Sequence, residues 1–223
     1  MLPLAVSGGV HQLGSVAREI ASRVLGVPEL LASLAGSRKP KQLRLRIVVL
    51  RDERGAPVLS RGELDEALGE TRRVLEREAA TRVVAAEGAF VTTAEERAPT
   101  DALDSPCGES GLWRTDLGAA GRYFRRLRVR GAIGRGAPIT VFVVRDVVGK
   151  CGCSLGPLGD YVTIDRSGLG ERTRRILAHE LGHSCGLRHK GDPENLMRAR
   201  GQGERLTRWQ RAVLRSSRHV TYL

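Results

Sequence analysis

One stretch of this sequence constrains its fold and chemistry more than any other: residues 179–189, which read His-Glu-Leu-Gly-His-Ser-Cys-Gly-Leu-Arg-His. A helix with 3.6 residues per turn places His179 and His183 on one face, because they lie four positions apart. Gly186 can end that helix with a positive φ, which strains a glycine very little. The chain can then turn back and bring His189 to the same point. The stretch therefore predicts a helix, a glycine turn and a cluster of three histidines.

Three clustered imidazoles form a ligand set that zinc prefers, with Zn–N distances of about 2.0–2.1 Å. Three protein ligands leave a fourth position open, which is typical of a catalytic zinc ion rather than a structural one. Glu180 follows the first histidine, where its carboxylate can reach a water at the metal without being a ligand. The sequence thus predicts one catalytic Zn²⁺ held by His179, His183 and His189, with Glu180 as the catalytic carboxylate. The alternative is a helix with unconnected surface histidines, and it is disfavoured because three of the chain's five histidines fall in this stretch.

The stretch resembles the zinc signature of the metzincin clan of metallopeptidases, in which the long histidine motif is followed by a Met-turn. Met197 lies eight residues after His189, in a Glu-Asn-Leu-Met segment that is similar to that turn. Methionine suits a position beneath three imidazoles because its side chain is flexible, apolar and polarizable. An ordinary core methionine is the alternative. The chain has only two methionines, one of them Met1, so the position of Met197 favours the Met-turn.

The resemblance implies a zinc-dependent endopeptidase that hydrolyses peptide bonds by metal-activated water, with Glu180 as the general base. It also implies an α/β (α+β) catalytic domain, with a twisted, mostly parallel sheet, an antiparallel edge strand, an active-site helix and a small C-terminal subdomain with a helix. Substrate is expected to lie along an edge strand within residues 147–158, opposite a pocket wall within residues 195–203. Lys190 and Ala199 stand where several families carry diagnostic residues, so the family within the clan stays open.

Two other functions remain compatible with the motif. One is a narrow-specificity processing peptidase or amidase that acts on a single target. The other is a zinc-binding module that has lost its peptidase activity. The intact Glu180 argues against the second, because a site without activity has no need of its base.

The net charge of +12 raises the question of a nucleic-acid partner. The arginines are scattered, and no series of aromatic side chains interleaves with them for base stacking, so the expected partner is a protein or peptide substrate. We expect a monomer. No apolar run reaches the roughly 18 residues needed to cross a bilayer. The N-terminus does not read as a signal peptide, whereas the resemblance favours a secreted or cell-envelope protein, so the location stays open.

The pattern of apolar residues divides the chain into two parts. Residues 1–42 read as a helical appendage and linker, expected to pack on the rest, and the sequence leaves open whether they inhibit it. Residues 43–223 read as the catalytic domain. Within it, periodicity and capping boxes predict strands at 43–50, 81–92, 139–144 and 161–165, helices behind Ser60 and Thr207, and the zinc helix over 172–185. Residues 122–130 read as either a helix or a strand.

Residues 93–117 lose hydrophobic periodicity and gather proline, aspartate, serine and glycine, which predicts a surface loop. Four acidic residues of this region raise the possibility of calcium: Asp101, Asp104, Glu109 and Asp116. They lack the ordered spacing of a calcium-binding loop, so a calcium ion is possible but unsupported.

The chain has four cysteines, which allow three pairings: Cys107, Cys151, Cys153 and Cys185. A bond between Cys151 and Cys153 would be strained, so an oxidised protein is expected to use one of the two crosswise pairings. Cys185 lies two residues past His183 and should face the core rather than the metal. A buried free thiol is at least as favoured there as a disulfide.

Overall fold

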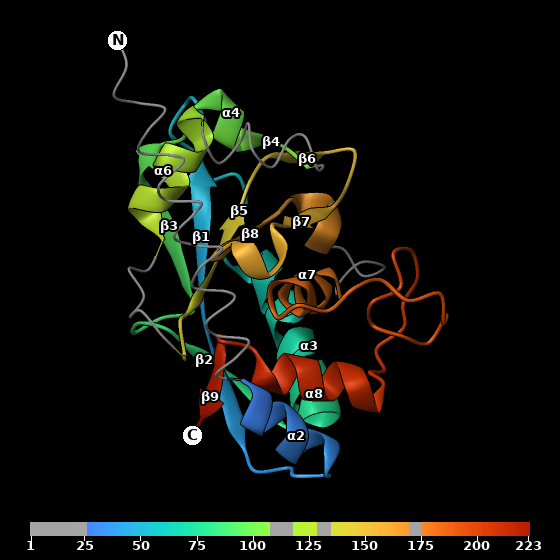
Figure 1. Ribbon diagram of the computed structural model, residues 1–223. Coiled ribbons are helices and arrows are strands. Elements are labelled where there is room, and N and C mark those ends of the chain that lie inside the picture. Colours follow the sequence, from blue (N-terminus) through green and yellow to red (C-terminus); the bar gives the residue numbers. More distant parts are fainter. Residues whose placement is uncertain (1–25, 108–117, 129–134, 170–174) are drawn as a thin grey trace.

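The longest strand, β1 (Lys41–Arg51), runs through the middle of the sheet in the computed structural model, which describes residues 26–107, 118–128, 135–169 and 175–223 (Figure 1). Its first half alternates between buried and half-buried side chains, and its second half is buried on both faces. Leu43, Leu45 and Ile47 contribute to one hydrophobic core. Val48 and Leu50 contribute to another on the opposite face. β1 therefore separates two cores, as expected of a parallel strand covered on both sides.

Seven strands of the described residues form the main sheet, in which five strands follow the order β2-β1-β5-β8-β7. Their bounds are β2 (Thr81–Ala85), β5 (Ile139–Val143), β8 (Tyr161–Ile164) and β7 (Gly152–Ser154). β3 (Val91–Arg97) and β9 (Val220–Tyr222) also pair with β1. The pairs among β1, β2, β3, β5 and β8 are parallel, and the edge strand β7 runs antiparallel to β8. The predicted α/β fold with an antiparallel edge strand is confirmed.

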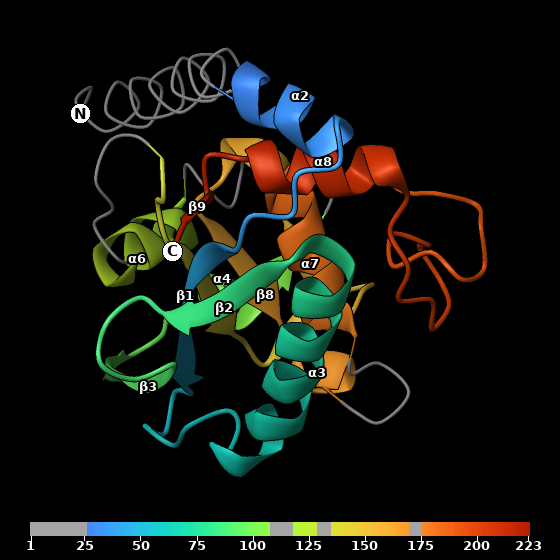
Figure 2. The same cartoon turned by 90° about the horizontal axis from the view of Figure 1, so that it is seen from below.

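Helices cover both faces of the sheet (Figures 1 and 2). α3 (Gly62–Ala79) and α7 (Ile176–Ser184) lie on one face, where their leucines join the core of β1, β5 and β8. α4 (Thr100–Leu103) and α6 (Ala119–Leu127) lie on the other face and pack through Leu103, Tyr123 and Phe124. Short 3-10 turns, η1 (Gly156–Leu158) and η2 (Arg166–Leu169), flank β8. No helix within the described residues is long and apolar enough to cross a membrane.

The N-terminal helix α2 (Val27–Leu34) lies beside the C-terminal helix α8 (Arg208–Ser216) in both ribbon views (Figures 1 and 2). The Arg208 guanidinium donates a hydrogen bond to the Leu34 carbonyl oxygen, and Arg215 Nε lies 3.3 Å from Ser33 Oγ. β1 begins at Lys41, so the last two residues of the expected 1–42 appendage belong to the sheet. Residues 1–25 of the expected appendage fall outside the described residues.

The single strand predicted over residues 81–92 is wrong, because the chain forms two strands there. β2 pairs with β1 as far as Ala85 opposite Leu45, and β3 starts at Val91 opposite Ile47. Residues 86–90 leave the ladder between them, at a segment that contains Gly88 with a φ of 28°. Both strands therefore use the same edge of β1, one after the other.

The surface loop predicted over residues 93–117 is also wrong for its first part. β3 extends to Arg97, α4 follows, and β4 (Asp104–Pro106) pairs in parallel with β6 (Asp146–Val148). These short elements depend on partners distant in sequence, so they leave little local periodicity. The Asp104 carboxylate accepts a hydrogen bond from Arg145 at 2.8 Å, and Glu109 and Asp116 lie outside the described residues.

The two predicted capping boxes differ in the structure. At α8, Thr207 and Gln210 form the complete reciprocal box, as predicted. At α3, the Glu63 carboxylate accepts from both the backbone N–H and the hydroxyl of Ser60, at 3.0 and 2.6 Å, and no side chain caps a helix N–H. Residues 122–130, left open between helix and strand, fall largely in the helix α6.

Candidate metal centre

The helix α7 presents both histidines of the motif to one cleft and ends at Ser184, two residues before the turn at Gly186 that the sequence predicts. Gly186 has a φ of +91°. Its N–H donates to the His183 carbonyl oxygen at 2.8 Å, and the Leu187 N–H donates to that of Gly182 at 2.9 Å. This pair of bonds is a Schellman motif, which a left-handed residue closes at the end of a helix. The chain therefore reverses direction and brings His189 back over the helix.

The three histidines converge on one point. The Nε2 atom of His189 lies 3.3 Å from that of His179 and 3.1 Å from that of His183. Four ligands at the corners of a tetrahedron about 2.05 Å from a zinc ion lie about 3.3 Å from one another. Within the described residues, this is the one cluster of three or more potential side-chain ligands that could hold a metal ion.

Hydrogen bonds fix the tautomers of two of the histidines. His179 Nδ1 donates to the Leu196 carbonyl oxygen at 2.7 Å, and His183 Nδ1 donates to that of Leu187 at 2.8 Å. A carbonyl oxygen can only accept, so each Nδ1 carries the proton and each Nε2 presents a lone pair to the shared point. Burial, together with the neighbouring histidines, lowers the pKa of His179 to about 3 and lowers the pKa of His183. Neutral imidazoles with converging lone pairs fit a bound cation.

Met197 is fully buried against α7. A Cβ atom added at Gly182 would lie 2.6 Å from Met197 Sδ, so the thioether packs on the helix between the two ligand histidines. The Met197 N–H donates to Asn195 Oδ1 at 2.9 Å, and its carbonyl oxygen accepts from the Lys190 N–H at 3.0 Å. The segment predicted as a Met-turn therefore lies under the histidine cluster, and the backbone after His189 is tied to it.

Arg175 is a contributor to the site that the sequence analysis missed. Its guanidinium is buried and donates to the carbonyl oxygens of Leu196 at 2.5 Å and Arg198 at 3.0 Å, and to that of Gly201. The Leu196 oxygen is the same atom that accepts from His179 Nδ1. Arg175 thus joins the helix to the segment under the metal site. Its position four residues before His179 was the available signal, because i and i+4 side chains share a helix face.

A second missed contact holds the same segment from the other side. The amides of Asn195 and Gln210 make two hydrogen bonds, at 2.8 and 3.1 Å, and Gln210 also completes the N-terminal cap of α8. Asn195 therefore connects Met197 to the C-terminal helix. The capping box was visible in the sequence, but its second role was not.

The histidines open into a cleft of about 720 Å³, lined on one side by residues 149–154 and on the other by residues 186–189, 199 and 200. Glu180 lines the cleft from α7 and is almost fully buried. Burial raises the pKa of its carboxyl to about 7, against the opposing effects of the Lys150 charge and a hydrogen bond from the Ser154 backbone. A Cβ atom at Gly152 would lie 3.0 Å from Glu180 Cγ, so β7 passes directly over this carboxyl group.

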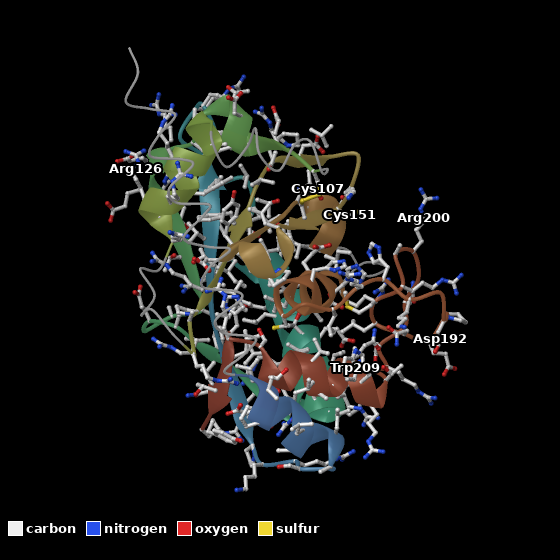
Figure 3. All side chains as sticks on the ribbon, viewed as in Figure 1. Cys107, Arg126, Cys151, Asp192, Arg200 and Trp209 are labelled. Carbon is white, nitrogen blue, oxygen red and sulfur yellow. A yellow bond between two sulfur atoms is a disulfide. The ribbon has the colours of Figure 1, made fainter. Side chains whose placement is uncertain are left out.

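One disulfide fastens the edge strand that lines the cleft. Cys107, which follows β4, is bonded to Cys153 in β7 (Figure 3). This bond belongs to one of the two crosswise pairings left open by the sequence, but the second bond of that pairing, between Cys151 and Cys185, is not formed. Cys185 is not part of a disulfide and packs in the hydrophobic core, which it was predicted to face, while the Cys151 thiol, also outside any disulfide, is half-buried and lines the cleft. The structure therefore distinguishes a bonded pair, an accessible thiol and a buried thiol.

Thiol titration should reproduce these three environments. In the native protein one thiol, that of Cys151, should react with a soluble disulfide reagent in seconds to minutes, and a second should react only after denaturation. Reduction should release two more. Closing a loop of 46 residues stabilises a protein by roughly 2–4 kcal/mol, so a reduced, alkylated sample should unfold at clearly lower denaturant concentration. Two fast-reacting thiols in the native protein would contradict the pairing.

Comparison with known proteins adds information at the level of fold. No family model matches the chain, and no curated protein matches it in sequence. A promirolysin mutant from Tannerella forsythia aligns with a TM-score of 0.51 at 11% identity, over 80% of each chain. Metalloproteinase-II from Bacteroides fragilis (TM-score 0.46, 10% identity) is covered over 56% of its length by 80% of this chain. Archaemetzincin from Methanopyrus kandleri (TM-score 0.43, 16% identity) is covered over 88% of its length by 79% of this chain.

Identities this low show a shared architecture and leave the family within the clan unassigned. The fold expected from the resemblance to the metzincin clan is therefore shared with the promirolysin structure, and His179, His183 and His189 form a cluster that could hold a metal ion.

Proposed function

We propose that this chain is a zinc-dependent endopeptidase. The observation that carries the proposal is the meeting, in one cleft, of three imidazoles whose Nε2 atoms converge and a buried carboxyl group from the helix that carries two of them. The triad suits a metal ion that takes nitrogen ligands, and an all-imidazole set with no carboxylate favours zinc over magnesium or calcium. A bound zinc ion supplies a Lewis acid that polarises the scissile carbonyl group and acidifies water.

Glu180 is the general base in this proposal. Its carboxylate takes a proton from the attacking water and delivers it to the nitrogen of the leaving amine, which lets the peptide bond break without releasing a free amide anion. A base works best when its pKa lies near the operating pH, and burial moves the pKa of Glu180 from the ordinary carboxyl range to about 7. The backbone of β7 over this group limits the access of bulk water.

The edge strand β7 is the surface on which a substrate would bind. One side of β7 pairs with β8, and the strand stands at the end of the sheet and lines the cleft. An extended peptide can pair with the other side through main-chain hydrogen bonds, which supply affinity with little dependence on side chains. Such pairing needs no free terminus, so it favours cleavage within a chain over removal of terminal residues.

Removing the metal should abolish cleavage. With 1,10-phenanthroline present, hydrolysis of casein and of a proteome-derived peptide library should fall to background, because the proposed base has no Lewis acid to act with. Adding about one equivalent of Zn²⁺ to the dialysed protein should restore it, and Mg²⁺ should not. Elemental analysis should give one zinc ion per chain. Undiminished cleavage by protein that elemental analysis shows to be free of zinc would overturn the proposal.

A further inference from the structure

The cleft has an uneven distribution of charge around the proposed catalytic group. Three basic residues line it, Lys150, Arg188 and Arg200. Among the described lining residues, Glu180 is the one acidic residue, and it is the proposed base. Apart from that group, the charged side chains that the described residues present to a substrate in the cleft are therefore all positive.

The three cations come from three separate segments on both walls of the cleft. Lys150 ends the turn between β6 and β7, which is fixed by a 2.8 Å hydrogen bond from its N–H to the Val147 carbonyl oxygen. Arg188 directly precedes His189. Arg200 lies three residues after Met197, and Figure 3 shows its side chain extending from that loop into solvent. The backbone beside each of these three residues is hydrogen-bonded or lies next to a histidine of the triad. Each residue is therefore held close to the proposed metal site.

These three side chains make no ion pair with an acidic group of the described residues. This distinguishes them from other arginines of the surface. Arg145, for example, binds both Asp104 and Glu53, and Arg126 binds Glu96 at 3.0 Å. All three cleft cations are exposed, so their charges are available to a ligand. The charge of Lys150 also reaches the site: it opposes the rise that burial causes in the pKa of Glu180, and it adds to the effect of burial in lowering the pKa of His183.

We propose that the cleft selects peptides that present a carboxylate group beside the scissile bond, with Lys150, Arg188 and Arg200 as the residues that recognise it. The inference rests on the proposed peptidase function and names its substrate class. Arginine can hold a carboxylate with two parallel hydrogen bonds, and lysine attracts it as a compact charge. A lysine or arginine of a substrate would instead be repelled by three like charges. The carboxylate can belong to an aspartate or glutamate side chain or to the C-terminus of a short peptide.

The overall positive charge of the protein is a competing explanation, because it attracts any anionic peptide. A matched control separates the two. Arg126 lies at the opposite edge of the molecule from Arg200 in Figure 3 and does not line the cleft. Arg126→Gln changes the net charge by the same amount as each neutralised cleft residue. Its surface ion pair contributes only about 0–1 kcal/mol, so the control variant should fold normally.

The first arm of the experiment profiles cleavage of a proteome-derived peptide library by the zinc-loaded parent, with Glu180→Gln as the background. Aspartate and glutamate should be enriched around the cleaved bond. The second arm takes one cleaved sequence and makes amidated peptides with Glu, Gln or Lys at the enriched position, and a Gln peptide with a free C-terminus. The Glu peptide should exceed the Gln peptide about 10-fold in kcat/KM, since each of several exposed charge pairs contributes roughly 2- to 5-fold.

The variants decide which residues are responsible. Each single substitution, Lys150→Gln, Arg188→Gln or Arg200→Gln, should lower the Glu-to-Gln ratio and their combination should bring it close to one, whereas Arg126→Gln, which changes the net charge as much as each single substitution, should keep it. Raising the salt concentration from about 0.05 to 0.5 M should reduce the ratio in the parent, because salt screens exposed charges. Cleavage without acidic enrichment, or an unchanged ratio in the triple variant, would overturn the inference. If kcat/KM rises only for the Gln peptide with a free C-terminus, and not for the Glu peptide, the cleft recognises the carboxylate at the end of a chain. That result would support the inference.

If the proposed peptidase function is wrong, the parent should cleave the library no faster than Glu180→Gln does. This result differs from a failure of the charge selection. A binding arm then still tests the inference. Tetramethylrhodamine-labelled Glu, Gln and Lys peptides are titrated with the zinc-loaded Glu180→Gln protein and followed by fluorescence anisotropy. Tightest binding of the Glu peptide, lost on adding the three cleft substitutions, would support charge selection. Equal affinities for the three peptides would refute it.

Discussion

Replacing Glu180 by glutamine should lower kcat/KM for peptide hydrolysis by about 10²- to 10⁴-fold, the range over which general acid–base groups contribute. Glutamine has nearly the same shape but cannot take a proton from water at neutral pH. The three imidazole ligands are unchanged, so zinc content should stay at one ion per chain. Activity would be measured on the peptides found by library profiling, and zinc by elemental analysis of the same samples.

Stability provides the control for this variant. Burial raises the pKa of Glu180, which means that the fold disfavours its charged form. The neutral glutamine should therefore leave the melting temperature unchanged or raise it. Glu96→Gln, at an exposed carboxylate that binds Arg126, should keep full activity. A Glu180→Gln protein that binds zinc and retains parental kcat/KM would rule out Glu180 as the base.

Replacing Arg175 by methionine should weaken zinc binding about 10- to 100-fold, as is usual when a group that orients a metal ligand is removed. The variant would leave the carbonyl oxygens of Leu196, Arg198 and Gly201 without their guanidinium donor. A buried carbonyl that loses its donor costs roughly 1–3 kcal/mol, and two of these three hydrogen bonds are only partly buried, so the free energy of unfolding should fall by about 1–3 kcal/mol. Competition with a chromogenic chelator measures the zinc affinity, and urea unfolding measures the stability.

Arg175→Lys tests whether zinc affinity depends on the positive charge of Arg175 or on the geometry of its hydrogen bonds. Lysine keeps the positive charge but cannot reach three carbonyl oxygens with one ammonium group, so zinc binding should remain weakened. A loss of stability with unchanged zinc affinity would mean that Arg175 supports the fold without positioning His179. Adding zinc in excess should recover part of the lost stability, because a ligand that binds only the native state stabilises it by mass action.

The parts of the site that could be predicted from sequence are those that depend on local geometry. Helical spacing places His179 and His183 together whatever surrounds them, and Gly186 supplies the conformation that returns His189. Distant contacts carry no such pattern. Arg175 reaches carbonyl groups 21 to 26 residues away, and nothing in its neighbours indicates that its charge is buried.

The difference between local patterns and distant contacts also explains which strands could be predicted from the sequence. The strands at Leu43, Ile139 and Tyr161 were evident because long apolar runs must be buried in a sheet. The separation of β2 from β3 depends on which residues of β1 they face, and the short pair β4 and β6 exists only through its long-range partner. The choice of Cys153 as the partner of Cys107 likewise depends on how β7 is placed beside β4, not on the spacing of the cysteines.

The close approach of Gly152 to Glu180 has a consequence for redesigning the specificity of this cleft. A methyl group at position 152 would press on the carboxylate side chain, at 3.0 Å from Cγ and 3.3 Å from Oε1. Variants of the edge strand that add a side chain there would alter catalysis and substrate preference together, and the two effects would be inseparable in a screen. Libraries directed at Lys150 and Ser154, with Gly152 held constant, would change what the edge strand presents to a peptide while leaving the proposed proton acceptor in place.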